Sequence, residues 1–394
     1  NTIKDFEHLL AVVSSGAPSV SGINLTVTPA RVIINGNTIQ DFTILNTGLI
    51  DLIKTLAING PLSTTSSING NTIQRISRTG ASGNIRAIVA GTVVGVSMDN
   101  NFVDVIGFTN VLSGGSIDGI LNAGGSGGSM SNNIVRNLSC PIGQIRGIVD
   151  LTNSGVKSIS NNQVYNFTTS PFGVGTGNFF GITIAPGSSN VSNNQVYNLN
   201  RTGSGTAGNV TGINIVGSAI FNTISSKNKI YDLTSTGNVV GTFVTGLNIS
   251  NSTQNSNFSI SNNFIGNLFT PASLNPSSIN GILNNNSTFL NTMDVFNNTI
   301  NLSGTSSSAT FGTSAISTLT GVNTILRNNI LINKTVPKGT GLAVAYRRAT
   351  SSSTTYSELS DNNLMFSGTP SATTLIFTDG TNSFQTMDAY RTFI

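Results

Sequence analysis

The chain contains little charge and few of the residues from which catalytic and metal sites are usually built. Of its 394 residues, 8% are Asp, Glu, Lys or Arg, against about 25% in ordinary soluble domains. It contains one Cys, one His and no Trp. The lone Cys140 excludes an intrachain disulfide and a cysteine-based zinc cluster. We therefore expect neither a cofactor nor a metal site.

Long apolar runs and basic clusters are also missing. The apolar stretches are far shorter than the roughly 18 residues of a membrane-spanning helix, which argues against membrane insertion. The formal net charge of +4 is dispersed, and the Lys and Arg residues are not interleaved with aromatics, so nucleic acid is not an expected partner. The densest basic spot, Arg347 and Arg348, is interpreted as a solvated pair at a coil edge rather than a phosphate site.

A six-residue motif recurs along almost the whole chain. It consists of Asn, any residue, Ile or Val, any residue, Asn or Asp, and then Leu or Phe, with weaker copies near the C-terminus. A short apolar strand precedes each motif, and a second strand between motifs usually opens with Gly, as in Gly181-Ile182-Thr183. Three short strands per interval, without helical periodicity, predict one three-sided coil per repeat.

We therefore predict an all-β fold, a right-handed parallel β-helix solenoid of about twelve three-stranded coils, in a single domain over residues 1–394. The motif Asn is expected to form a corner of the coil, because Asn tolerates left-handed backbone geometry. Stacked copies should hydrogen-bond to one another and satisfy their amides in a dry interior. This structural asparagine ladder is predicted to contain Asn37, Asn71, Asn101, Asn133, Asn162, Asn194, Asn228, Asn263, Asn298, Asn329 and Asn363.

The asparagine doublets carry a resemblance to known proteins. Pairs such as Asn132-Asn133, Asn161-Asn162 and Asn193-Asn194 resemble the ladder corner of right-handed, pectate-lyase-like β-helices. The segment from Asp361 to Asn382 is similar to the last coils of secreted β-helix repeat proteins of Bacteroidota. The resemblance implies an extracellular or cell-surface location, export by type IX secretion, and a fragment of a larger secreted protein.

Two columns of stacked side chains are candidate ligand-binding sites. Arg86, Asp118 and Arg146 alternate in charge in successive coils, which fits either an acidic-sugar site or an ion-pair ladder contributing up to about 1 kcal/mol per pair. The second column, a tyrosine stack, fits either a platform for sugar rings or aromatic stacking that contributes about 0.5–1.5 kcal/mol per pair. It contains Tyr165, Tyr197 and Tyr231. The structural interpretation is favoured for both columns.

No catalytic residues are predicted, because the acids do not converge. A hydrolase of this fold would need carboxylates about 5–10 Å apart, but the locally enriched acids fall in different columns. These are Asp99, Asp104, Asp118 and Asp150. The outward centre of the Gly-Ile sheet is read as a column without an acid, a base or a metal ligand. The column runs Asn24, Val89, Leu121, Val149, Thr183, Asn214, Asn248, Leu283, Ser317 and Ala343.

The sequence thus favours a non-catalytic extracellular module, such as a rigid stalk, an adhesin segment or an exported passenger. Glycans or another surface or secretion protein are the partners that this interpretation implies. The alternative is a carbohydrate-binding or polysaccharide-degrading β-helix of lyase or glycosidase type. Ice or mineral-surface binding ranks last, because Thr is plentiful but forms no sustained column.

Overall fold

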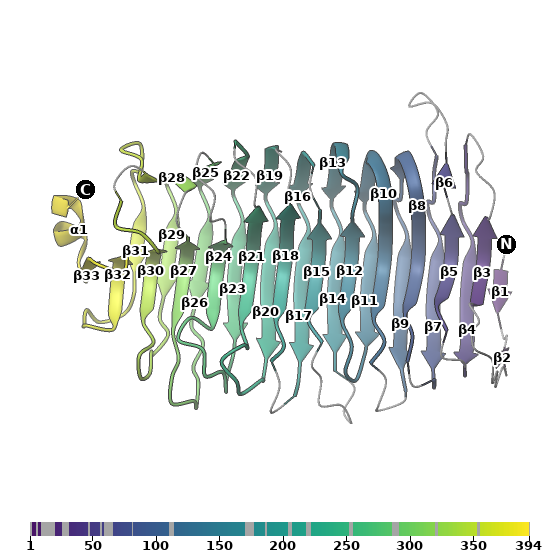
Figure 1. Cartoon of the computed structure of the whole chain (residues 1–394), viewed down its shortest axis with the longest axis horizontal. Coiled ribbons are helices and arrows are strands. Elements are labelled where there is room, and N and C mark those ends of the chain that lie inside the picture. Colours follow the sequence, from purple (N-terminus) through teal and green to yellow (C-terminus); the bar gives the residue numbers. More distant parts are fainter. Residues whose placement is uncertain are drawn as a thin grey trace.

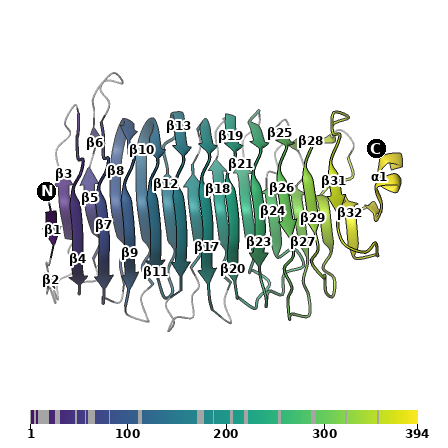
Figure 2. The ribbon, with the colours of Figure 1, turned by 180° about the vertical axis from the view of Figure 1, so that it is seen from behind.

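The computed structural model of the chain describes most of its length. The residues described are 2–4, 7–8, 20–25, 31–45, 48–55, 57–58, 66–80, 82–109, 114–169, 177–185, 187–203, 207–217, 222–251, 255–285, 291–319, 322–352 and 355–393. These residues form a rod in which the chain winds from one end to the other, so that the two termini lie at opposite ends (Figures 1 and 2).

The architecture is an all-β parallel solenoid of about 10 turns, close to the predicted number of coils. A typical coil contains three strands: β14 (Gln163–Thr168), β15 (Phe179–Ile184) and β16 (Ser189–Ser192). Each strand pairs in parallel with its equivalents in the neighbouring coils. Like strands therefore pile up into three sheets that run the length of the rod, as the repeat predicts.

The three sheets are named here by their order in the coil. The first sheet holds the motif strands: β1 (Thr2–Lys4), β4 (Thr38–Ile44) with β2 (Glu7–His8) beside it, β7 (Thr72–Arg78), β9 (Phe102–Phe108), β11 (Ile134–Ser139), β14, β17 (Gln195–Arg201), β20 (Lys229–Ser235), β23 (Phe264–Phe269), β26 (Thr299–Leu302), β29 (Ile330–Asn333) and β31 (Leu364–Phe366).

The second sheet follows it: β3 (Val20–Leu25), β5 (Ile50–Thr55), β8 (Ile85–Ser97), β10 (Ile117–Ser131), β12 (Ile145–Asp150), β15, β18 (Val210–Gly217), β21 (Val244–Asn251), β24 (Ile279–Asn284), β27 (Thr313–Thr318), β30 (Ala343–Arg348) and β32 (Thr374–Thr378). The third sheet comprises β6 (Ala57–Ile58), the ends of β8 and β10, β13 (Ser154–Ser160), β16, β19 (Asn222–Ser226), β22 (Asn257–Ser261), β25 (Asn291–Phe296) and β28 (Val322–Arg327).

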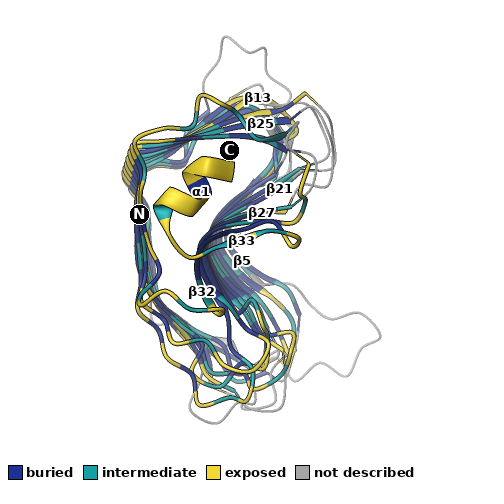
Figure 3. Ribbon diagram, turned by 90° about the vertical axis from the view of Figure 1, so that its left-hand side faces the viewer, coloured by how far each residue is buried: buried dark blue, intermediate teal, exposed yellow. Residues whose placement is uncertain are grey.

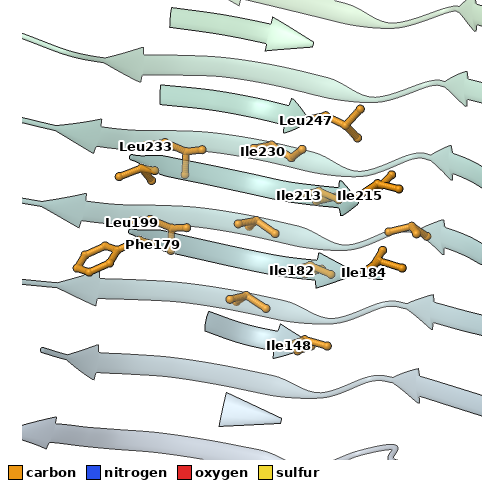
Figure 4. Close-up of a cluster of buried hydrophobic side chains, with 14 of the residues drawn as sticks. Ile148, Phe179, Ile182, Ile184, Leu199, Ile213, Ile215, Ile230, Leu233 and Leu247 are labelled. Atoms are coloured by element: carbon orange, nitrogen blue, oxygen red, sulfur yellow. The ribbon is translucent and has the colours of Figure 1, made fainter. Parts of the chain in front are cut away.

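The core is a narrow apolar column inside the coils. Equivalent positions of successive second-sheet strands carry Ile148, Ile182, Ile213 and Leu247, which are in register and shielded from solvent. Figure 4 shows these side chains stacked one coil above the next. β-Branched side chains pack well on such a pleated surface, which explains the preference for Ile and Val at these positions.

The predicted asparagine ladder is confirmed, and Asn194 illustrates its geometry. Its Nδ2 donates to Oδ1 of Asn228 at 3.0 Å and to the carbonyl of Ile159 at 2.9 Å. Its Oδ1 accepts from Nδ2 of Asn162 at 2.8 Å and from the backbone N–H of that residue at 3.1 Å. The Nδ2-to-Oδ1 bond recurs between all neighbouring members of the predicted ladder.

The left-handed backbone conformation lies one residue before each ladder asparagine, not at it. Within the doublets, Asn161 and Asn193 have φ values of 57° and 56°, whereas the ladder residues that follow them have no positive φ. The expectation that the ladder Asn itself makes the bend was therefore wrong. The residue before the ladder asparagine turns the chain, and the ladder asparagine itself supplies the buried amide. The positive-φ residues at this corner are Gly36, Gly70, Asn100, Asn132, Asn161, Asn193, Lys227, Asn262, Asn297, Asn328 and Asn362.

The fifth motif position is left-handed as well in the copies from Asp41 to Asn267, which explains the recurring Asn or Asp there. The pairing of β14 with β17 passes from Tyr165 to Phe167 without including Asn166 and skips Asn198 of β17 as well, so the two strands turn together and keep their register. A second, external row of amides follows, which the sequence analysis missed: Nδ2 of Asn166 donates to Oδ1 of Asn137 at 3.0 Å, and Nδ2 of Asn198 donates to Oδ1 of Asn166 at 2.6 Å.

In coils such as that of β15, the recurring Gly lies inside the second-sheet strand, so the expectation that it opens the strand was wrong. Gly181 is the third residue of β15. A Cβ placed on it would lie 2.3 Å from Cγ1 of Val196 in the first sheet and 2.6 Å from the carbonyl oxygen of Gly212. Glycine is required here because the second sheet bows inward and approaches the opposite wall, as Figure 3 shows end-on.

The C-terminal end of the core is covered by the chain itself. Strand β33 (Ser383–Phe384) pairs antiparallel with β32, and helix α1 (Met387–Phe393) follows it. Figure 3 shows α1 lying across the end of the coils. Tyr390 is 2% exposed, stacks on Phe377 with ring centroids 4.7 Å apart, and donates its hydroxyl hydrogen to the Tyr356 hydroxyl at 2.8 Å. This cap replaces the coil that would otherwise shield the last apolar layer.

Candidate functional site

The charged column on the outer face of the second sheet is a set of Arg–Asp ion pairs in which each carboxylate is matched by an arginine within the protein. The strand register places Arg86, Asp118 and Arg146 next to one another, as predicted. Nε and Nη2 of Arg146 donate to the two carboxylate oxygens of Asp118 at 2.6 and 2.8 Å. Arg86 binds Asp51 of the preceding coil in the same way, at 2.6 and 2.8 Å.

These contacts leave the column little capacity for a ligand. The side chains of Asp51 and Asp118 are 1% and 4% exposed, because the arginines cover them. Lys54 adds a second contact to Asp51 at 2.9 Å. The Nε–Nη2 edge with which an arginine grips a carboxylate is already occupied within the protein in both pairs.

The tyrosine column forms the predicted stack. The rings of Tyr165 and Tyr197 are 4.7 Å apart and 6° from parallel, and those of Tyr197 and Tyr231 are 5.0 Å apart and 2° from parallel. A sugar-binding platform presents a ring face. Within the stack the rings cover one another's faces, whereas the outer face of Tyr231 lies beside Gly266 of the next coil, which has no side chain. The far side of Tyr165 lies 6.0 Å from Cζ of Arg136. The geometry fits the structural interpretation, with edges and hydroxyls turned outward.

The tyrosine stack joins a charged network at the Arg136 end. Arg136 donates to the Tyr165 hydroxyl at 3.0 Å and to Asp104 at 2.9 Å, and Asn137 also donates to Asp104. Burial alone would raise the pKa of Asp104, but the hydrogen bonds from Arg136 and Asn137 outweigh it and lower that pKa. Asp104 is therefore a satisfied carboxylate and a poor candidate for a general acid.

The remaining acids are dispersed, as the columns predict. Asp99 accepts from Ser129 and from the Ser131 backbone at a third-sheet corner. Asp150 lies inside the coil, where Thr152 donates to it and Lys157 approaches to 3.4 Å. Within the described part of the chain, no three His, Cys, Asp or Glu side chains form a group that could hold a metal ion. In the same residues, no helix is long and apolar enough to cross a membrane.

Cys140 is buried, and its side chain is held by contacts with the backbone. Its Sγ lies 3.0 Å from the carbonyl oxygen of Gly115 and accepts from the Gly143 N–H at 3.2 Å. Burial raises the pKa of this thiol to about 11. Because the thiolate is the reactive form of cysteine, this residue is poorly suited to act as a nucleophile.

A groove of about 500 Å³ lies on the outer face of the second sheet near the C-terminal coils; it is called the Arg347 groove here. Its lining combines apolar and uncharged polar side chains with two arginines. The lining residues are Phe243, Asn275, Ser277, Asn280, Leu283, Asn285, Ser317, Leu319, Leu342, Arg347, Arg348, Ala349, Thr378 and Gly380.

The position of Arg347 corrects two sequence predictions. It pairs in register with Ser317 and Thr378, so Arg347, not Ala343, belongs to the outward column of the second sheet. The alignment slipped by four residues because Gly341 was taken as the recurring Gly, whose place Ala345 fills. Lys54 was also omitted from that column, at its N-terminal end.

The arginine pair is not solvated, contrary to the sequence prediction. Arg348 is 5% exposed and donates to the Ser352 carbonyl at 2.9 Å. Arg347 is half-buried, and its Nε and Nη2 are shielded and have no hydrogen-bond partner among the described residues. Desolvation lowers the pKa of Arg347. In the sequence, Ala345-Tyr346 is equivalent to Ala315-Ile316 of the preceding coil. Aligning these two pairs would have placed Arg347 correctly.

Other unpartnered polar atoms share this face. They include Oγ1 of Thr245, Oδ1 of Asn248, Oδ1 of Asn280 and Oγ of Ser314, all on β21, β24 and β27. The structure therefore separates two regions of the second sheet: an N-terminal part in which the charged groups form ion pairs, and a C-terminal part in which several buried polar atoms have no partner among the described residues.

No protein-family model matches the chain, and no curated protein or solved structure matches it at a significant level. Function is therefore inferred from the geometry of this chain itself.

Proposed function

We propose that this chain is a non-catalytic structural module of an exported protein, serving as a rigid stalk or adhesin-like passenger at a bacterial cell surface. The observation that carries the proposal is the unbroken ladder from Asn37 to Asn363, which ties the coils into one rod. Each ladder amide satisfies its neighbour in the interior, so bending the rod would break buried hydrogen bonds along its length.

The arrangement of charge supports the non-catalytic part. Asp51, Asp104 and Asp118 are each engaged by an arginine, and Cys140 is buried with a raised pKa. An enzyme needs an acid, base or nucleophile that can reach a substrate, and these groups are committed to packing. Surface export is supported by the low charge, by the Asn-, Ser- and Thr-rich composition, and by the likeness of the last coils to secreted β-helix repeat proteins of Bacteroidota.

Location is tested by antibody labelling of intact cells of the source organism, compared with lysed cells. Labelling of intact cells, lost after brief surface proteolysis, is the expected result. Signal that appears only after lysis would refute the surface assignment.

Catalysis is tested by incubating the purified protein with a panel of neutral and acidic polysaccharides and measuring new reducing ends and unsaturated products. No product is expected. Product formed by the wild type and by Asp388→Ala, which alters an exposed acid on the terminal helix, but not by a folded Asp118→Ala, would overturn the non-catalytic assignment.

Glycan binding without catalysis is the second candidate. It is favoured by the row of uncharged amides on the outer face of the second sheet, where Nδ2 of Asn248 donates to Oδ1 of Asn214 at 2.8 Å. Amides and hydroxyls of this kind match sugar hydroxyls as donors and acceptors. A glycan array probed with the wild type and with Asn248→Ala tests it, and equal binding by the two proteins would argue against this face.

A further inference from the structure

We propose that the Arg347 groove binds an organic carboxylate, with the guanidinium of Arg347 gripping the carboxylate and the groove walls holding its carbon body. This site is separate from the charged column at Arg86 and Arg146. It does not depend on whether the rod is displayed on a cell.

The first step of the argument is an unbalanced charge. Among the described residues, no Asp or Glu lines the groove, and none forms an ion pair with Arg347. Its neighbours in the column, Ser317 and Thr378, are uncharged. A charged group withdrawn from water is costly unless a counter-charge or hydrogen bonds compensate it, so a half-buried guanidinium without a protein partner points to a ligand.

The second step comes from the other arginines of this molecule. Arg75, Arg86 and Arg146 each hold a carboxylate with Nε and Nη2, at 2.5–2.8 Å. In Arg347 the same two nitrogens are unpartnered. The planar fork matches the two oxygens of a carboxylate. In this structure that edge of Arg347 is shielded from solvent, so the ligand is taken up as the side chain turns its fork into the groove.

The third step concerns the rest of the ligand. Phe243, Leu283 and Leu319 supply apolar walls, and Asn280 is one of the uncharged polar residues of the lining. A volume of about 500 Å³ lies within the range of small-molecule sites, which are mostly apolar with a few placed polar groups. The groove thus fits a carboxylate with a compact body better than a bare inorganic ion.

The experiment titrates the full chain with sodium benzoate and with sodium glucuronate, whose bodies are apolar and hydroxylated. Sodium acetate, chloride and sulfate serve as comparisons at equal ionic strength. Binding is followed by calorimetry and by the shift in unfolding temperature. Arg347→Gln and Arg347→Lys remove the fork in two ways, and Arg327→Gln, at an exposed arginine outside the groove, is the matched control.

We expect benzoate or glucuronate to bind more tightly than acetate, and both Arg347 variants to weaken that binding by roughly tenfold or more, as loss of a charge-assisted bidentate contact does. Arg327→Gln should bind like the wild type. Without ligand, Arg347→Gln should unfold at the same or a higher temperature, because an uncompensated charge is removed.

Three results would each overturn the proposal. The first is an absence of binding by either carboxylate to the wild type. The second is unchanged binding in Arg347→Gln, and the third is an equal response to sulfate or chloride, which would mean a general salt effect.

Discussion

Removing one ladder asparagine should destabilise the rod severely, and Asn194→Ala is the sharpest case. The side chain of Asn194 takes part in four hydrogen bonds, two as donor and two as acceptor. It is 0% exposed, so water cannot replace the missing partners without entering the core. The substitution also leaves a small void, since a methyl group takes the place of an amide.

The magnitude follows from what is left unpaired. Each buried hydrogen bond contributes about 1 kcal/mol net, and a buried polar group left without a partner costs about 1–3 kcal/mol. The backbone N–H of Asn162 and the carbonyl of Ile159 both lose a partner. A loss of roughly 3–5 kcal/mol is therefore expected, with part of the ladder compensating through bonds that remain.

The measurement must resolve local effects, because repeat proteins respond mainly in the altered repeat and its neighbours. Hydrogen exchange should show loss of protection around Asn162 to Asn228 and little change near the C-terminal cap. The chain has no Trp and six Tyr, so urea unfolding is followed by tyrosine fluorescence. Tyr165, Tyr197 and Tyr231 report on these coils, while Tyr346, Tyr356 and Tyr390 report on the C-terminal end. Asn200→Ala, at an exposed position of β17, the strand that follows Asn194, is the matched control and should change stability by less than about 0.5 kcal/mol.

A charge variant adds a pH test of the same reasoning. In Asn194→Asp the ionised side chain can only accept, yet it would face Oδ1 of Asn228 and the carbonyl of Ile159. Burial and these acceptors favour the protonated form and raise its pKa above the unfolded value. The variant should therefore be least destabilised at acidic pH and lose stability as the pH rises through its folded pKa. If Asn194→Ala were no more destabilising than Asn200→Ala, the ladder would not hold the coils together.

Three further predictions concern strain, close packing and the thiol. Val105 is a β-branched residue at φ 51°, at a position where most other left-handed copies of the motif have Asn or Asp. Val105→Asn should stabilise the protein by about 1 kcal/mol, and a lower urea midpoint would contradict this. Gly181→Ala should cost about 1–3 kcal/mol or more through its contact with Val196, and an unchanged unfolding temperature would refute the close approach. With a pKa of about 11, the thiol of Cys140 should be about 0.1% ionised at pH 8; it should react with a thiol reagent only after unfolding, and rapid labelling of the native protein would refute its burial.

Several features of the fold were predictable because the solenoid repeats one local solution. The motif spacing indicated three strands per coil and the members of the ladder, since side chains at equivalent positions must stack when coils pile up. The tyrosine stack and the order of Arg86, Asp118 and Arg146 followed from the same alignment.

Other features were beyond the reach of the pattern. The recurring Gly looked like a strand opening, because sequence alone does not show that two sheets approach closely enough to exclude a Cβ at Gly181. The place of Arg347 was misjudged where Ala345 substitutes for that Gly and the repeat loses its marker.

The sequence alone determined the stacking of coils and the identity of the ladder, because periodicity is a one-dimensional property that folding preserves. Only the tertiary structure decided which charged groups are neutralised. Asp118 and Arg146 are 28 residues apart and form a bidentate pair, whereas Arg347 lies beside Ser317 and Thr378 and has no ion pair among the residues that the structure describes. Pairing depends on which side chain the next coil brings within about 3 Å, and that is set by the packing of the sheets.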